Sequence, residues 1–320
     1  MAQNNNNNNN NKSKMEESEY DLIIVGGGCA GYPAGMYASR FNLKTLVITK
    51  LRGGLITMTH VVENYPGFIS LTGQELANNL ENHAKANNVE ILDDDVSSIE
   101  KKGNYFNVKV TYAGKELKAK AIVLATGTEH RHLGAPGEKE FFGRGVSYCA
   151  TCDGGFYKDK IVGIVGGSDS AAKEAMVLAQ NSSKVYMFVR SKLRAEPINI
   201  DRIKANPKIE VITGVNIKEI YGNKFVEGVE LDNGKKVELS GIFIAIGMLP
   251  QNDLAKSLGV ELNKRGEIII DKMSKTSVDG VFSAGDVTNM TWKQGIVAAA
   301  EGSVAGYSAF EYIDEKFNNN

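Results

Sequence analysis

The sequence predicts an α/β protein of two domains, with the second domain inserted into the first. A glycine-rich loop with the pattern Gly-x-Gly-x-x-Gly, at residues 26–31, connects an apolar strand at 22–25 to a helix at 30–40. A related loop, at residues 166–171, follows another apolar strand at 160–165. A chain of 320 residues is also too long for one ordinary hydrophobic core. We therefore expect two Rossmann-like nucleotide-binding domains, each with three layers in a ββα arrangement.

The first nucleotide-binding unit is completed by an apolar strand at 45–49. Its glycines lie where a dinucleotide needs a tight turn, a close approach of the backbone to the pyrophosphate, and close packing of the helix. The N-terminus of the helix then faces the phosphates. The second strand ends in Thr49 and Lys50 rather than in an acid. This ending argues against a plain NAD site and leaves the ribose contact unassigned.

Further segments of the first domain follow this unit. The adjacent glycines Gly53 and Gly54, and the segment 62–68, suggest backbone that lies close to a flat ligand, with a plain surface loop as the alternative. The other elements expected there are a helix at 71–87, short strands with a hairpin-like turn at 89–114, and a buried strand at 120–127.

The second domain begins with a polar connector at residues 129–145. After the strand at 160–165, a helix at 171–180 and a strand at 184–189 complete its nucleotide-binding unit. A strand at 241–247 mirrors the one at 121–127, and we interpret these two strands as the exit from the first domain and the return to it.

These assignments define the predicted domain boundaries. Residues 129–248 form the second domain, and residues 19–128 together with 249–320 form the first. The segment 280–287 and a helix at about 294–313 complete the first domain. Residues 1–18 contain an unbroken asparagine run and are expected to be a disordered tail, because such a segment cannot bury enough apolar surface.

The connector leads to two cysteines, Cys149 and Cys152, which are separated by two residues and followed directly by Asp153. This spacing brings the two sulfurs within bonding reach. A disulfide between them would close so short a ring that it would stabilise the fold little. The same spacing often lowers the pKa of one thiol. Asp153 can move a proton to or from a thiol if it reaches one. The pattern predicts a redox-active pair. The alternative, half of a zinc site, needs two more ligands and lacks a second Cys-x-x-Cys.

Composition argues against several classes of protein. The net charge of −1 gives no reason to expect a nucleic acid or an anionic membrane as a partner. The sequence has no run of about 20 apolar residues, so no transmembrane helix is expected. Three cysteines are too few for a secreted disulfide scaffold. A Cys-x-x-Cys beside nucleotide-binding units instead indicates a reducing compartment, here expected to be the cytoplasm.

These motifs resemble those of the low-molecular-weight thioredoxin reductases over nearly all of residues 20–313. The resemblance implies FAD in the first domain, NADPH in the second, thioredoxin or a similar small dithiol protein as oxidised substrate, and a homodimer in which the second domain rotates. It also implies that Cys149 and Cys152 shuttle between dithiol and disulfide with Asp153 as acid or base, without a metal. The segments that carry it are the first glycine loop, Glu63–Gly67, Ala125–Gly127, Cys149–Gly154, Arg194–Glu196 and Ala284–Val287.

The resemblance also assigns cofactor residues. For FAD these are Gly26, Gly28, Gly31, Gly54, Asn64, Thr126, Gly127, Gly285, Asp286 and Gln294. For NADPH they are Gly166, Ser168, Asp169, Ser170, Arg190 and Arg194.

The chain departs from the family pattern mainly at the donor site. Ser168 replaces the middle glycine of the second loop, and Val189 stands where the family has one of its phosphate-binding arginines. In the first domain, Cys29, Leu55 and Lys293 replace a usual proline, glutamine and arginine. Two alternatives therefore stay open. One is a flavin dithiol reductase of the same fold that uses NADH, ferredoxin or another donor, and the other is a non-enzymatic FAD-binding redox sensor.

Overall fold

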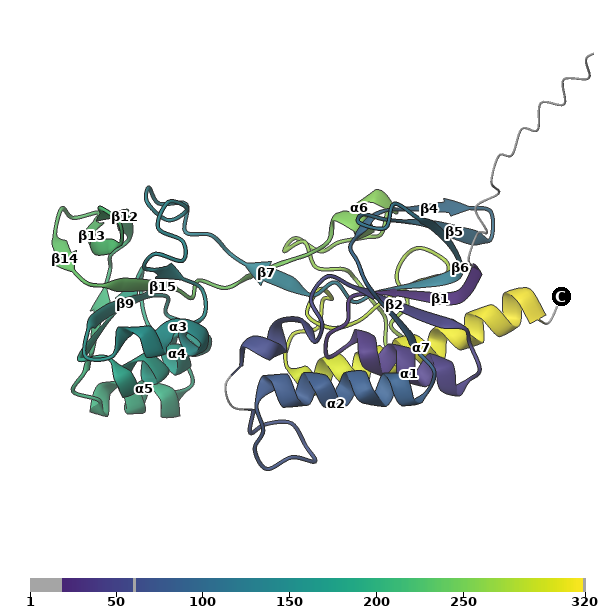
Figure 1. Ribbon diagram of the computed structural model, residues 1–320, viewed down its shortest axis with the longest axis horizontal. Helices are drawn as coiled ribbons and strands as arrows, with labels where there is room; N and C mark the ends of the chain where they lie inside the picture. Colours follow the sequence, from purple (N-terminus) through teal and green to yellow (C-terminus); the bar gives the residue numbers. More distant parts are fainter. Residues whose placement is uncertain (1–18, 60–61, 319–320) are drawn as a thin grey trace, which may run out of the picture.

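The computed structural model describes residues 19–59 and 62–318, so the tail expected at 1–18 lies outside the described residues. The chain forms two bodies joined by thin connecting segments, with β7 (Thr128–His130) between them (Figure 1). The first body holds both ends of the described chain, and the second holds its middle. Each body contains a sheet with parallel strands and packed helices, which confirms the predicted α/β fold class.

The first body is built on a seven-stranded sheet in the order β3-β2-β1-β6-β5-β4, with β17 paired to β6. β1, β2, β3 and β17 run parallel to their neighbours, whereas β4, β5 and β6 form antiparallel pairs. The strands are β1 (Glu19–Val25), β2 (Thr45–Thr49), β3 (Glu90–Asp93), β4 (Val96–Lys102), β5 (Tyr105–Val110), β6 (Glu116–Leu124) and β17 (Val281–Ser283).

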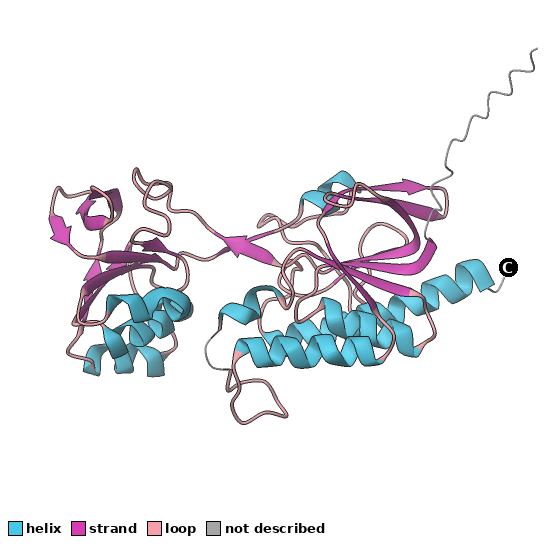
Figure 2. Ribbon diagram, in the orientation of Figure 1, coloured by secondary structure: helices cyan, strands magenta, loops and turns pink. Residues whose placement is uncertain are grey.

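Alternation along β1 gives this sheet two buried faces. Leu22 and Ile24 pack on the helical side, while Ile23 and Val25 pack on the opposite side with side chains of β4–β6. The helices of this body are α1 (Gly31–Arg40), the 3-10 helix η1 (Gly54–Met58), α2 (Gly73–Ala86), α6 (Asp253–Ser257), α7 (Gly295–Ile313) and the π-helical turn η3 (Asp314–Asn318). Figure 2 shows the long helices gathered along one side of the strands, whereas the short α6 lies on the other side, beside β4.

Helices α1 and α7 pack with their backbones in contact. A Cβ atom added at Gly302 of α7 would lie 2.0 Å from the carbonyl oxygen of Ala30. One added at Gly306 would lie 2.4 Å from that of Ala34. Because α1 follows β1 and α7 follows the loop after β17, both helices begin near the carboxyl ends of parallel strands.

The second body has a parallel five-stranded sheet in the order β11-β10-β9-β15-β8 and a separate three-stranded antiparallel sheet, β12-β13-β14. Its strands are β8 (Val146–Ser147), β9 (Ile161–Val165), β10 (Lys184–Val189), β11 (Ile209–Thr213), β12 (Ile217–Gly222), β13 (Val226–Leu231), β14 (Lys236–Glu238) and β15 (Gly241–Ile244). Its helices are α3 (Ala150–Asp153), η2 (Gly154–Tyr157), α4 (Asp169–Asn181) and α5 (Pro197–Ala205).

The strand predicted at 241–247 is β15. It lies in the second sheet, between β9 and β8 and within residues 129–248, and the chain returns to the first body only after it. It mirrors β6 because each lies beside the first strand of its own nucleotide-binding unit. The chain passes between the bodies at β7 and β16 (Met248–Pro250), which pair with Met248 opposite His130.

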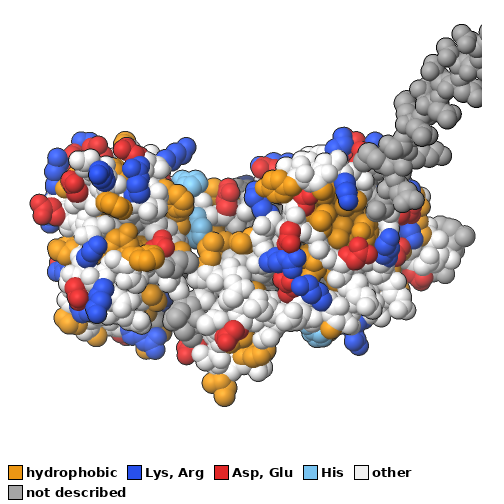
Figure 3. Space-filling model, in the orientation of Figure 1, with side chains coloured by type: hydrophobic (Ala, Val, Ile, Leu, Met, Phe, Trp, Pro, Cys, Tyr) orange, Lys and Arg blue, Asp and Glu red, His pale blue; other side chains and the backbone are white. Residues whose placement is uncertain are grey.

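Within 19–59 and 62–318, no helix is long and apolar enough to cross a membrane. On the face drawn in Figure 3, positive and negative side chains are interspersed, in keeping with the net charge of −1.

Candidate active site

A cavity of about 790 Å³ opens at the carboxyl ends of the parallel strands of the first body. Its volume falls in the range of cofactor pockets. It brings together the ends of β1, β2, β6 and β17 with η1 and the start of α7. The residues predicted to bind FAD that line it are Gly26, Gly28, Gly54, Thr126, Gly127, Gly285, Asp286 and Gln294.

The first glycine loop fits a dinucleotide on steric grounds. Gly26 has a φ of +111°, and a Cβ atom there would lie 2.1 Å from the carbonyl oxygen of Ala125. A Cβ atom at Gly31 would lie 1.7 Å from the carbonyl oxygen of Gly26, so α1 can begin here only with glycine. At Gly28 the nearest atom would be 3.6 Å away, which leaves its backbone open toward the cavity. This arrangement fits the pyrophosphate of a dinucleotide.

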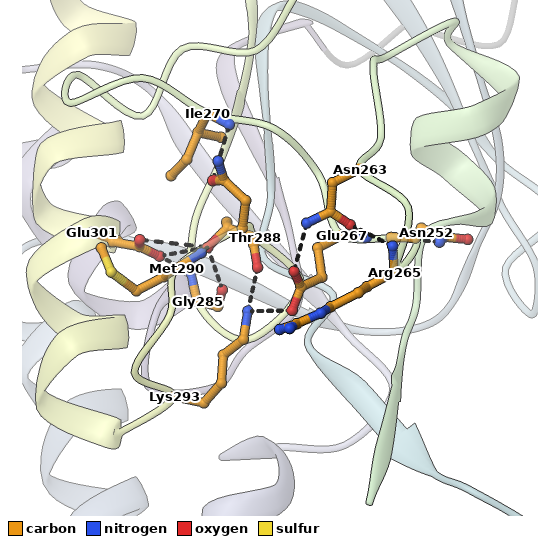
Figure 4. Close-up of polar contacts among 12 residues, drawn as sticks. Asn252, Asn263, Arg265, Glu267, Ile270, Gly285, Thr288, Met290, Lys293 and Glu301 are labelled. Atoms are coloured by element: carbon orange, nitrogen blue, oxygen red, sulfur yellow. Dashed lines mark hydrogen bonds and ion pairs between the residues drawn. The ribbon is translucent and has the colours of Figure 1, made fainter.

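A buried acid braces the opposite wall of the cavity (Figure 4). The carboxylate of Glu301, on α7, accepts hydrogen bonds from the N–H of Gly285 at 2.8 Å and from the hydroxyl of Thr288 at 3.1 Å. Burial raises the pKa of Glu301, and these two hydrogen bonds act in the opposite direction. The neighbouring Asp286 therefore lies on a loop whose backbone is held in place by the hydrogen bonds to Glu301.

Lys293 holds the far end of the same loop (Figure 4). Its ammonium group donates to the carbonyl oxygen of Thr288 and forms an ion pair with Glu267 at 3.2 Å. Burial raises the pKa of Asp286, and the charge of Lys293 lowers it. The lysine thus performs a structural task, bracing the loop, at the position where the family has an arginine.

Asn64 and Cys29 complete this part of the site. Asn64 lies next to the cavity lining and donates through Nδ2 to Oε1 of Gln294 at 3.0 Å. Cys29 is a free thiol in the cavity wall. Burial, and then the charge of Asp286, raise the pKa of this thiol to about 12, so it stays neutral at physiological pH.

The redox motif lies at the start of α3. Cys149 directly precedes this helix, its N–H donates to Oγ of Ser147 at 3.0 Å, and its carbonyl oxygen accepts from the N–H of Asp153 at 3.1 Å. Cys149 takes part in a disulfide. The side chain of Cys152 lies outside the described side chains, so the pairing of Cys149 with Cys152 stays a prediction.

Cys149 contacts the segment that forms one wall of the cavity. Its Sγ atom lies 3.7 Å from the carbonyl oxygen of Met58, the last residue of η1, and other residues of η1 line the cavity. Asp153 is half-buried, and its charge contributes, after burial, to the raised pKa of the nearby Tyr157.

The second glycine loop repeats the geometry of the first. A Cβ atom at Gly166 would lie 2.2 Å from the carbonyl oxygen of Ala245, as Gly26 does with Ala125. Ser168 caps α4 by accepting from the N–H of Ala171 at 3.4 Å, and Ser170 is exposed in the first turn. The middle residue of this loop therefore serves as a helix cap here.

The carboxylate of Asp169 is used within the protein. It accepts from the N–H of Glu196 at 3.0 Å and from Nδ2 of Asn199 at 2.7 Å, and it pairs with Lys173 at 2.7 Å. These contacts tie the segment after β10 to the first turn of α4. Asp169 thus helps to hold the backbone of the predicted donor site in place through these hydrogen bonds.

The predicted phosphate-binding arginines lie on that segment. Arg190 and Arg194 are both exposed just after β10, and the N–H of Arg194 donates to the carbonyl oxygen of Gly167 at 2.6 Å. Val189, in contrast, is buried and packs against Gly167. The side chains of Arg190 and Arg194 are therefore available beside the second loop, whereas the side chain of Val189 is buried in the core.

A polar network beside the redox motif escaped the sequence analysis. The buried carboxylate of Glu138 accepts from the hydroxyl of Tyr148 at 2.6 Å and from the N–H groups of Leu133 and Gly134 at 2.7 and 2.6 Å. Nδ1 of His132 lies 2.7 Å from the same hydroxyl. Tyr148 directly precedes Cys149, so this network fastens the redox motif to the connector from β7. Among the described side chains, no cluster of His, Cys, Asp or Glu could hold a metal.

Comparisons with known proteins agree with this geometry. The family model for pyridine nucleotide-disulphide oxidoreductases matches residues 20–302. The thioredoxin reductase of Bacillus subtilis is 40% identical over 309 residues, which cover 94% of this chain and 96% of that protein. The crystal structure of Lactococcus lactis thioredoxin reductase in the FR conformation is similar, with a TM-score of 0.87 and 34% identity over 92% of this chain and 99% of that one.

A third relative differs in a useful way. The thioredoxin reductase of Streptococcus pyogenes has a TM-score of only 0.64, although it is 37% identical over 93% of this chain and 99% of that one. Its coverage and identity are close to those of the Lactococcus protein, so the two solved structures differ mainly in how well they superpose on this chain as a whole.

Proposed function

Since the chain belongs to the pyridine nucleotide-disulphide oxidoreductase family, we propose that it is an NADPH-dependent thioredoxin-disulfide reductase that works through FAD. The observation that carries this proposal is the position of Cys149. Its disulfide lies at the start of a helix, on the body that also holds the second glycine loop, and its sulfur contacts the wall of the cavity in the first body. This position supports a path in which electrons pass from a donor site on the second body, through a cofactor in the cavity of the first body, to the disulfide of Cys149.

FAD is the cofactor that fits the cavity best. When bound, a flavin relays an electron pair between a nicotinamide and a disulfide. Residues 19–128 and 249–320 supply the site: the first glycine loop takes the pyrophosphate, while Asp286 and Gln294 face the remainder of the cofactor. Purified protein is expected to be yellow and to release FAD on heating. A colourless protein that cannot be reconstituted with FAD would contradict this assignment.

NADPH binds, in this proposal, to the domain formed by residues 129–248. Gly166 and Ser168–Ser170 open α4, whose N-terminus favours the pyrophosphate. Arg190 and Arg194 are exposed where the 2′-phosphate of NADPH would lie, and planar guanidinium groups suit a phosphate well. No acid that would select the free hydroxyl of NAD follows β10 directly.

Electrons then leave through Cys149 and Cys152, with Asp153 moving the proton. The disulfide takes up an electron pair, its S–S bond breaks, and the dithiol form passes the pair to the disulfide of thioredoxin. Because the redox motif and the donor loop belong to the same body, rotation about the β7–β16 connection can exchange them at the cavity. The two TM-scores, 0.87 and 0.64, support such a rearrangement within the family.

Two further parts of the proposal concern the setting. A hollow between α1 and α7 is lined by Tyr37, Phe41, Val304 and Tyr307, and two of these, Tyr37 and Tyr307, are exposed aromatic residues. We assign this apolar face to a homodimer interface, since exposed apolar patches mark contact sites. A dithiol mechanism requires a reducing compartment, which we take to be the cytoplasm.

The test is an anaerobic titration of the purified protein with NADPH and with NADH, followed by oxidised thioredoxin. We expect NADPH to bleach the flavin absorbance and thioredoxin to restore it. Bleaching by neither nucleotide would point to another donor, such as ferredoxin. Bleaching without turnover of any protein disulfide would overturn the proposed function and favour a redox sensor.

A further inference from the structure

A half-buried carboxyl group with one buried oxygen atom packs near the redox motif and has no part in the proposed reaction so far. Glu174 belongs to α4, which packs against α3, the short helix that begins after Cys149. Its Oε2 atom is buried and, among the described residues, has no hydrogen-bond partner. A buried polar atom without a partner is costly, so such an atom calls for an explanation.

The only described partner of this carboxylate ties it to the reactive cysteine. The backbone N–H of Ala150 donates a hydrogen bond to the Glu174 carboxylate. Ala150 follows Cys149 directly, so standard chain dimensions place the Cys149 sulfur within about 8 Å of the carboxylate. The packing between the helices is close as well, because a Cβ atom at Gly154 would lie 3.2 Å from the side chain of Leu178 on α4.

The charge on this carboxyl group is finely balanced. Burial raises the pKa of Glu174 to about 7, and the Ala150 N–H acts in the opposite direction. On α4 itself, Lys173 is paired with Asp169. In the described part of the chain, three helical elements and three strands pack against α4, and β9 carries no titratable side chain. The titratable and charged groups on the others are Cys149 and Asp153 around α3, Tyr157 on η2, Asp201, Arg202 and Lys204 on α5, Lys184 and Tyr186 on β10, and Glu210 on β11.

We propose that Glu174 is a positioning residue of the redox centre that binds a proton when the Cys149 disulfide is reduced. The inference rests on the proposed reductase function and deepens it. Glu174 fixes the first turn of α3 through the Ala150 N–H. It also responds to the charge on sulfur, since two nearby negative charges in a buried place disfavour each other.

The reduction step balances in atoms and charge. The S–S bond breaks, an electron pair from the reduced flavin enters, and one proton gives one thiol and one thiolate. The new thiolate raises the pKa of Glu174, which then takes a second proton from solvent wherever it was deprotonated before. On reoxidation by the protein substrate the thiolate charge disappears and Glu174 releases its proton. Electron transfer is therefore coupled to a second proton, which is held by the carboxyl group of Glu174 and not by a cysteine sulfur.

The test measures how many protons accompany each electron pair. Full-length FAD-loaded protein is equilibrated in dithiothreitol redox buffers between about pH 6 and 8, the free thiols are trapped by alkylation, and the potential of the pair is plotted against pH. We expect proton uptake per pair in wild-type protein to rise from close to one at about pH 6 to close to two at about pH 8, because Glu174 is increasingly deprotonated in the oxidised protein as the pH rises, and Glu174→Gln to stay near one throughout. Glu174→Asp, which keeps a titrating carboxyl group, is expected to restore part of the difference.

Controls separate this inference from the proposed function. Glu219→Gln removes an exposed carboxylate on β12 of the same body and is expected to behave as wild type. The measurement uses neither NADPH nor thioredoxin, so its result remains valid if the proposed electron donor or protein substrate is wrong. A cysteine pair that never forms a dithiol would instead contradict the proposed function itself. Equal proton uptake in wild type and in both Glu174 variants would overturn the role of Glu174.

Discussion

The side chain of Asn64 donates to that of Gln294 at 3.0 Å, across 230 positions of the sequence. Asn64 lies in the segment after η1, and Gln294 is the N-cap residue of α7. This bond joins the two segments that border the cavity on either side. It therefore closes the rim of the site to which we assign FAD.

The first prediction tests this bond. Asn64→Ala and Gln294→Ala should each weaken FAD retention by about 2–10-fold, the effect of losing one hydrogen bond. The double variant should lose less than the product of the two effects, since both remove the same bond. Binding of FAD to the apoprotein, monitored by quenching of FAD fluorescence, measures the dissociation constants of the wild type, the two single variants and the double variant. Full multiplicativity would show that the two side chains act independently.

The second prediction concerns the redox motif. Cys149→Ser and Cys152→Ser should each abolish thioredoxin reduction and leave flavin reduction by the donor intact, because the pair acts after hydride transfer. Asp153→Asn should slow turnover by about 10²-fold or more. Cys29→Ser is the comparison variant: because this half-buried thiol lies in the cavity wall and not in the redox motif, the variant should still reduce thioredoxin. A cysteine variant that reduces thioredoxin at the wild-type rate would refute the mechanism.

The parts of this molecule that the sequence predicts are local ones. Strand, glycine spacing and helix follow one another within about 30 residues in a nucleotide-binding unit, so both loops are found without a structure. The strand at 241–247 has the apolar run of a buried strand, but composition does not say which sheet it joins. The predicted boundaries place it in the second domain, but only its pairing with β9 and β8 shows which neighbours it has in that sheet.

The buried acids show the same limit within the site. Glu138, Glu174 and Glu301 look like ordinary surface residues in the sequence. Each acquires its role from a backbone N–H of another segment: Glu138 from Leu133 and Gly134, Glu174 from Ala150 and Glu301 from Gly285. Such contacts depend on how helices pack, and no local pattern encodes them.

The third prediction concerns the Glu138 network. Glu138→Ala leaves the N–H groups of Leu133 and Gly134 and the hydroxyl of Tyr148 without their acceptor, and should cost about 2–4 kcal/mol of unfolding free energy. Tyr148→Phe removes one bond and should cost about 1 kcal/mol. Urea denaturation followed by circular dichroism measures both. Equal costs would show that the Leu133 and Gly134 contacts contribute nothing.

The fourth prediction concerns pH and stability. The pKa of Glu174 is raised from 4.5 to about 7 on folding, so the folded chain binds this proton more tightly than the unfolded chain does. Its stabilising contribution is complete below about pH 4.5 and is lost as the pH rises through about 7. Wild type should therefore lose up to about 3 kcal/mol relative to Glu174→Gln across this window. Denaturation midpoints at several pH values test this, and a constant difference would contradict it.

The last prediction concerns the electron donor, where the chain departs most from its family. Arg190 and Arg194 are exposed beside the second glycine loop, while Val189 is buried and cannot reach a phosphate. A hydrogen bond to a charged group is worth about 1.5–3 kcal/mol, so a site that lacks one should bind NADPH about 10-fold or more weakly than a complete site.

The two remaining arginines should still make the enzyme prefer NADPH to NADH, because only NADPH carries the phosphate that they bind. Arg194→Ala should raise the KM for NADPH about 10-fold or more and change the KM for NADH little. Arg202→Ala, an exposed arginine on α5, is the matched control and should leave both constants unchanged. If the wild-type enzyme shows no preference for NADPH, the assignment of Arg194 fails. Because the cysteine pair and the cavity would be unaffected by that outcome, the chain would then be a dithiol reductase that draws its electrons from another donor.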